Sequence, residues 1–129
     1  MNSTTDNKQF VAQYLQALSG NPKTPELVAR YVSDHALAEH IYQAEAGFPS
    51  YEIVVEELIA ERDLVAVRGT FRGMHRGAFA GIDATGRQVS AGLMIIYRVK
   101  GDRIVEHWMQ FDAAALMSQL TDARAARAS

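Results

Sequence analysis

The 129-residue sequence is 48% hydrophobic and 22% charged, which predicts one globular domain over residues 1–129 with flexible ends at 1–5 and 121–129. Its net charge of −2 excludes the basic surface typical of nucleic-acid-binding proteins. The absence of cysteine excludes a thiol nucleophile and a thiolate metal site. Without an apolar signal core or a membrane-spanning run, we expect a cytoplasmic protein that does not bind membranes.

Three stretches before residue 50 have helical periodicity. The first follows a candidate cap at Asp6 and runs to about residue 18. The second begins with Thr24 as cap and Pro25 as its first helical residue, and the third follows Ser33 or Asp34. The helices should present Tyr14, Tyr31 and His40 on or beside their apolar faces.

The pattern then changes to four β-rich stretches separated by turn residues, at 51–61, 65–75, 87–99 and 103–111. Such spacing predicts an antiparallel meander. A last helix begins at or just after Asp112. Three helices, a curved four-stranded sheet and a short closing helix make an α+β domain.

Strand phase indicates which side chains face the helices. In the second strand, alternation places Phe71 and His75 on the apolar inner face. The third strand is apolar on both faces, with Met94 and Ile96 pointing away from the helices. Because too few helices exist to cover that outer face, we expect a homodimer packed through it.

The last strand, RIVEHWMQF, is ambiguous. Strict alternation places Trp108 and Asp112 on one face and His107 on the other, so that all three face inward only if a bulge intervenes. We favour the register in which Trp108 and Asp112 point inward.

Two long segments, FRGMHRGAFAGIDATGRQVS and IIYRVKGDRIVEHWMQFDAAALMSQL, resemble the SnoaL-like polyketide cyclases. The stretch HIYQAEAGFPSYEIVVEELIAERDLVAV also resembles that family, so the similarity covers residues 37–120. The resemblance implies a nuclear transport factor 2-like α+β cone, dimers and a deep apolar pocket between helices and sheet. One departure is SDHALAEHI, which stands where the family commonly has a strand with an Asp-His pair.

The resemblance implies that Asp112 is the acid/base group of an intramolecular aldol ring closure, with His75 and Trp108 at or near the pocket. An aspartate at the mouth of an apolar cavity loses hydration and becomes a stronger base. As the cap of the last helix, the same carboxylate would be a weaker one. Both roles of Asp112 stay open.

Proton abstraction beside a carbonyl produces an enolate, which needs hydrogen-bond donors. The candidates are His75, Trp108, Tyr14 and Tyr31, while Phe71, His40 and His107 are further candidates for substrate contact. This chemistry requires neither a metal nor an organic cofactor. The sequence therefore predicts a cofactor-independent cyclase, isomerase, dehydratase or hydrolase acting on a small apolar carbonyl compound, or alternatively a noncatalytic dimeric binder of a lipophilic ligand.

Overall fold

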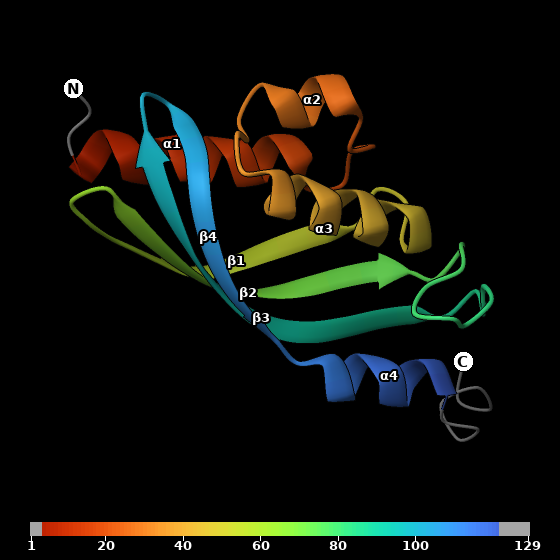
Figure 1. Cartoon of the computed structure of the whole chain (residues 1–129). Helices are drawn as coiled ribbons and strands as arrows, with labels where there is room; N and C mark the ends of the chain where they lie inside the picture. The colour runs from red at the N-terminus through yellow and green to blue at the C-terminus, as the bar shows by residue number, and fades with distance from the viewer. Residues whose placement is uncertain (1–3, 122–129) are drawn as a thin grey trace.

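The computed structural model describes residues 4–121. Three helices come first, four strands follow, and a helix closes the chain (Figure 1). The elements are α1 (Thr4–Leu18), α2 (Pro25–Ala29), α3 (His35–Gly47), β1 (Glu52–Glu61), β2 (Leu64–Met74), β3 (Gln88–Lys100), β4 (Arg103–Phe111) and α4 (Ala113–Thr121).

The sheet is an antiparallel meander in the order β1-β2-β3-β4, as the strand pattern predicts. It curves beneath α1, α2 and α3, and α4 lies past the end of β4 (Figure 1). The core lies between these helices and the inner face of the sheet, where alternate residues of β3 from Val89 to Val99 are buried. The predicted α+β architecture is confirmed.

The helix starts show which caps the chain uses. Thr24 and Asp34 accept hydrogen bonds from the backbone N–H groups three residues later, at 3.2 Å each, as expected for N-caps. The cap predicted at Asp6 is wrong, because α1 already begins at Thr4. Residues 4 and 5 therefore belong to a helix and residue 121 ends one, while the other residues predicted to be flexible lie outside the described part of the chain.

A β-bulge in β4 decides which residues face the helices. Arg98 pairs with Glu106 and Val99 with Ile104, so Val105 is an extra residue that opposes no partner. Ile104 is buried on the inner face, and after the extra residue His107 returns to that same face. The bulge therefore reverses the phase of the rest of the strand.

The segment between α2 and α3 lies along the free edge of β4. Val32 forms a parallel bridge with Ile104, whose carbonyl accepts the backbone N–H groups of Ser33 (2.8 Å) and Asp34 (3.2 Å). The Arg103 guanidinium also binds this segment, donating to the Ser33 hydroxyl and the Val32 carbonyl. The segment that contains SDHALAEHI thus contributes one β-bridge, and no strand of its own, to the described part of the chain.

The outer face of the sheet carries an apolar row that none of the helices within residues 4–121 covers. The strand register aligns one residue from each strand, namely Ile59, Ala66, Ile96 and Trp108. Three of the four are exposed large hydrophobic side chains, as is Met94 beside them. Among residues 4–121, no helix is both long enough and apolar enough to cross a membrane.

Candidate functional site

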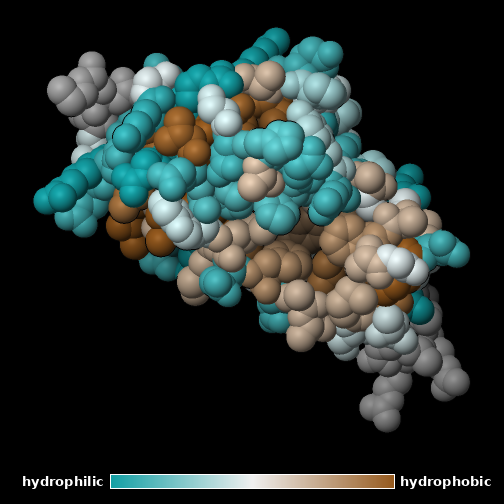
Figure 2. Space-filling model, viewed as in Figure 1, coloured by the Kyte–Doolittle hydropathy of each residue, from teal (hydrophilic) through white to brown (hydrophobic). Residues whose placement is uncertain are grey.

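A cavity of about 170 Å³ lies between the helices and the inner face of the sheet. Its walls are mostly carbon, and Figure 2 shows a hollow bordered by hydrophobic residues on the face seen there. The residues that line it are Tyr14, Leu15, Leu18, Ser19, Lys23, Leu37, His40, Ile41, Gln43, Ala44, Phe48, Tyr51, Ile53, Phe71, Phe79, Leu93, Ile95, Tyr97, Met109, Phe111 and Leu116. An apolar ligand with a few polar groups suits such a wall.

Three buried tyrosines, Tyr14, Tyr51 and Tyr97, supply hydroxyl groups to the cavity. The Tyr14 and Tyr97 rings meet edge-on, with their centroids 5.7 Å apart. Burial is the main reason that the pKa of each phenol lies above its ordinary value. All three therefore remain protonated at neutral pH and can act as hydrogen-bond donors.

A histidine–aspartate pair lies next to the cavity and contacts the lining residue His40, although neither member of the pair lines the cavity itself. His107 Nδ1 is 2.7 Å from Asp34 Oδ2, and both side chains are largely buried. The His107 ring also meets the ring of His40 edge-on, with centroids 5.6 Å apart, and His40 lines the cavity. His107 is in addition the cross-strand neighbour of Tyr97, another lining residue.

The Asp34 carboxylate has two tasks, because one oxygen caps α3 and the other binds His107. Burial alone would raise the pKa of Asp34. The hydrogen bond with His107 and the backbone N–H groups of Leu37 and Ala36 outweigh burial, and the pKa lies below its ordinary value. At neutral pH Asp34 is therefore an anion, which orients the imidazole by accepting its Nδ1–H.

His75 faces inward as predicted and is fully buried, but it does not line the cavity. Its Nδ1 accepts the backbone N–H of Thr85 at 3.1 Å and lies 3.0 Å from the Thr85 hydroxyl. The neutral ring therefore carries its proton on Nε2, which has no hydrogen-bond partner among the described residues. These contacts fix the loop between β2 and β3, and the catalytic role of His75 stays a prediction.

Trp108 and Asp112 do not point inward, so the predicted register of β4 is wrong. The bulge at Val105 places Trp108 on the outer face, where it is 47% exposed and lies beneath the Arg98 guanidinium. Asp112 is exposed, and its Oδ1 accepts the backbone N–H of Ala115 at 3.0 Å. Asp112 therefore caps α4, and its role as the acid/base group stays a prediction.

Two substitutions of Asp112 separate the cap from the base. Asp112→Asn keeps a good N-cap, so the free energy of unfolding should change by less than about 0.5 kcal/mol, whereas Asp112→Ala should lose about 1 kcal/mol. Urea denaturation measures both. A folded Asn variant that lost its activity would restore the acid/base role of Asp112, because the amide retains the cap and lacks the basic oxygen.

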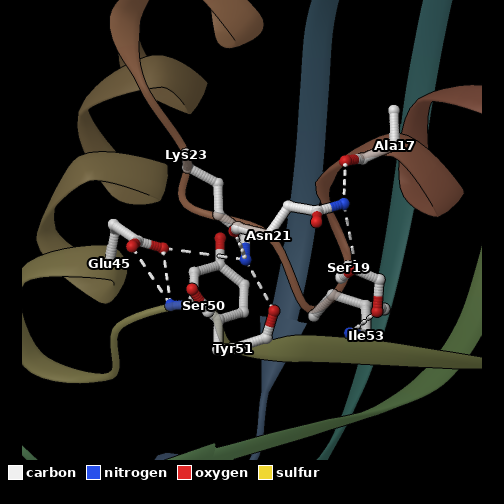
Figure 3. Close-up of polar contacts among 8 residues, drawn as sticks. All are labelled: Ala17, Ser19, Asn21, Lys23, Glu45, Ser50, Tyr51 and Ile53. Carbon is white, nitrogen blue, oxygen red and sulfur yellow. Dashed lines mark hydrogen bonds and ion pairs between the residues drawn. The ribbon is translucent and has the colours of Figure 1, made fainter.

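Lys23 is a lining residue that the sequence did not single out. Its side chain is 1% exposed, and Nζ donates to the carbonyls of Asn21 at 2.8 Å and Tyr51 at 2.6 Å. Figure 3 shows the amine between these two residues, with Glu45 of α3 facing it at 3.6 Å. Burial, opposed by Glu45, lowers the pKa of Lys23 to about 8.

The cavity thus brings together only part of the predicted site. Tyr14, Phe71 and His40 line it, Tyr31 packs against Tyr14 from behind, and His107 contacts His40. The sequence reasoning missed four residues as site candidates: Lys23, Asp34, Tyr51 and Tyr97. Tyr97 alternates with the outward-facing Met94 and Ile96, so strand phase could have identified it, whereas Asp34 was identified only as a helix cap.

The residues present do not form an evident metal centre. Within residues 4–121, no three His, Asp or Glu side chains come together in a way that could hold a metal ion. His107 and Asp34 form a hydrogen-bonded pair, and the His40 ring meets the His107 ring edge-on. This arrangement suits proton exchange between neighbouring groups.

Comparisons with solved structures identify the fold. AclR of Streptomyces galilaeus matches with a TM-score of 0.77 and 22% identity, over 92% of this chain and 82% of that one. TsrD of Streptomyces laurentii matches with a TM-score of 0.74 and 23% identity, over 94% and 98%. A SnoaL-like polyketide cyclase of Agrobacterium tumefaciens matches with a TM-score of 0.70 and 19% identity, over 93% and 99%. The fold is the nuclear transport factor 2-like α+β cone.

Among curated proteins, none matches the sequence significantly. The family model for SnoaL-like polyketide cyclases matches residues 6–120, which is nearly the whole described chain. It includes most of α1, all of α2, α3 and the four strands, and most of α4. With the cone, the cavity and this match together, the chain belongs to the SnoaL-like polyketide cyclase family.

Proposed function

We propose that this protein is a cofactor-independent, cyclase-type acid/base enzyme for a small apolar carbonyl compound. The observation that carries the proposal is the 2.7 Å contact between His107 and Asp34, next to His40 in the wall of an apolar cavity. An imidazole oriented by a buried carboxylate is a common general base. The proposal therefore assigns the proton transfer to His107 in place of Asp112.

In this mechanism, His107 donates its Nδ1–H to Asp34, which leaves Nε2 with a lone pair. Nε2 removes a proton from a carbon that lies between carbonyl groups. The exposed His40, in contact with His107 and lining the cavity, exchanges protons with solvent. Proton return to the product completes the cycle.

The negative charge that develops on the carbonyl oxygen needs donors, and the cavity tyrosines supply them. Tyr14 and Tyr97 are both buried in the cavity wall, so their hydroxyl groups can donate hydrogen bonds to a ligand. Because burial keeps the phenols protonated, these donors persist at neutral pH. The enolate carbon can then attack a second carbonyl of the same molecule, which is an aldol ring closure.

The test of this proposal is proton exchange in a model carbon acid. Ethyl 2-methylacetoacetate has a single acidic hydrogen between its two carbonyls, and its replacement by deuterium in D₂O is followed by proton NMR. Wild-type protein should accelerate the exchange above the buffer rate, and His107→Gln should remove the acceleration. Equal rates with and without wild-type protein would contradict the proposal.

A noncatalytic binder of lipophilic ligands is the second candidate, favoured by the mostly carbon wall of the cavity. In that case an apolar probe such as 8-anilinonaphthalene-1-sulfonate would bind the wild type and the His107→Gln variant with the same affinity. Neither protein would accelerate deuterium exchange. The exchange measurement therefore distinguishes the two functions.

We also propose that the protein is a homodimer packed through the outer face of the sheet. The row Ile59, Ala66, Ile96 and Trp108 supplies an apolar centre. Ion pairs border this row, at Arg68 with Glu56 and Glu57 on one side and at Arg98 with Asp63 and Glu106 on the other. An apolar centre with a charged rim is typical of a protein interface.

Substitution of Ile96 tests the dimer. Ile96→Lys places a charge in the middle of the apolar row, where two copies would bring two such charges together. Sedimentation equilibrium of the wild type should give twice the chain mass of 14.2 kDa, and the variant should give the chain mass. Lys100→Arg, which preserves charge at an exposed position, is the control and should leave the dimer intact. A monomeric wild type at micromolar concentration would contradict the proposal.

A further inference from the structure

Lys23 is a buried amine in the wall of the cavity that the proposed acid/base mechanism does not use. It lies in the segment between α1 and α2, with its ammonium nitrogen 3.9 Å from the centre of the Tyr51 ring. Lysine side chains are rarely buried, because the ammonium group loses hydration. Its position therefore calls for a chemical explanation.

The Lys23 nitrogen has two short hydrogen bonds and one longer contact, so a neutral amine could keep both of its hydrogens bound there. Two carbonyl oxygens, of Asn21 and Tyr51, lie at 2.8 and 2.6 Å and accept two N–H groups. The next acceptor, the Glu45 carboxylate, is 3.6 Å away and is itself bound by the backbone N–H of Ser50, at 3.1 Å to each oxygen (Figure 3). A neutral amine thus has both hydrogens bound and its lone pair free.

The charges that face Nζ raise the pKa of Lys23, but burial lowers it by more. Glu45 of α3 and Glu52 of β1 both raise the pKa of Lys23, whereas burial lowers it to about 8. At pH 7.5 the neutral fraction is then about 200-fold larger than for an ordinary lysine. A neutral amine next to a carbonyl-binding cavity is a nucleophile.

We propose that Lys23 is a carbonyl-reactive amine that forms an imine with an aldehyde or ketone bound in the cavity. The nitrogen lone pair forms a bond to the carbonyl carbon, and the C=O π electrons move to oxygen, which takes up a proton. The resulting carbinolamine then loses water as the nitrogen lone pair forms the C=N bond. One carbonyl compound and one protonated or neutral amine thus give one iminium or imine and one water.

Reductive trapping tests this directly, because the chain has only three lysines, Lys8, Lys23 and Lys100. Butanal and cyanoborohydride convert each imine into a stable butylated amine, which peptide mass spectrometry locates. Lys8 and Lys100 are exposed, so access alone predicts that they react first. We expect Lys23 to react at least tenfold faster than either at pH 7.5, with a rate that rises with pH around a midpoint near 8.

Two variants serve as controls. Lys8→Arg should retain the fast reaction, and Lys23→Arg should lose it. If Lys23→Arg does not fold, the ranking of the three lysines in the wild type decides alone. Labelling of Lys8 and Lys100 at rates equal to or above that of Lys23 would overturn the proposal, as would a midpoint above pH 10.

The inference shares with the proposed function only the assumption that the cavity takes a carbonyl compound. Labelling at Lys23 does not use His107, so the His107→Gln variant should be trapped at the wild-type rate. Failure of deuterium exchange with normal Lys23 labelling would remove the acid/base mechanism and leave the imine site. Normal deuterium exchange with no labelling at Lys23 would remove the imine site and leave the acid/base mechanism.

Discussion

Replacement of His107 by glutamine is expected to reduce the accelerated deuterium exchange of ethyl 2-methylacetoacetate by at least about 100-fold, the usual contribution of a general base. Glutamine can still donate a hydrogen bond to Asp34, so the segment before α3 keeps its attachment to β4. The variant lacks only the basic ring nitrogen. Proton NMR in D₂O, at one pH and one protein concentration, gives both rates.

His35→Gln is the matched control, because it removes a histidine from the same region without touching the cavity. The His35 side chain is 90% exposed and its contact is with Glu39 on the surface of α3. Its exchange rate should equal that of the wild type. A His107→Gln variant that exchanges as fast as His35→Gln would exclude His107 as the base.

Gly77→Ala is expected to destabilise the fold by about 3 kcal/mol or more, at the upper end of the cost of overpacking. A β-carbon at residue 77 would lie 2.0 Å from the carbonyl oxygen of Ala46. The backbone N–H groups of Arg76 and Gly77 both donate to the carbonyl of Gly47, so the loop is held against the end of α3. It cannot move aside without losing these hydrogen bonds.

Gly92→Ala is the matched control for this stability measurement. A β-carbon at residue 92 meets no atom within 4 Å, and alanine is favoured over glycine inside a strand by about 0.5–1 kcal/mol. Urea denaturation at a single protein concentration should therefore show unchanged or slightly increased stability. Similar losses in the two variants would contradict the packing argument for Gly77.

Much of the fold could be predicted from local pattern. Period-two alternation and turn residues located all four strands, and the Thr24-Pro25 pair located the start of α2. The inward phase of Phe71 and His75 also followed from alternation, because β2 pairs with β3 without interruption. These features depend on residues that are close together in the sequence, so they can be predicted from it directly.

The site depended on contacts between distant residues, which local pattern does not reveal. Asp34 and His107 are 73 positions apart and meet only because the segment after α2 lies along β4. Lys23 and Tyr51 are 28 positions apart, and they meet because the segment between α1 and α2 lies beside the segment between α3 and β1. Nothing near Val105 in the sequence indicated an extra residue, so strict alternation selected Trp108 and Asp112 in place of His107.

The unpaired Val105 has a consequence for reading related sequences. If Val105 were instead paired regularly, strict alternation would return and the two sets of side chains would exchange faces, turning Trp108 and Asp112 toward the cavity and His107 toward the outer face of the sheet. Two relatives can therefore share the same letters in this strand and still present different functional groups to their ligands. Whether the strand is bulged or regularly paired therefore carries chemical information that residue identity alone does not.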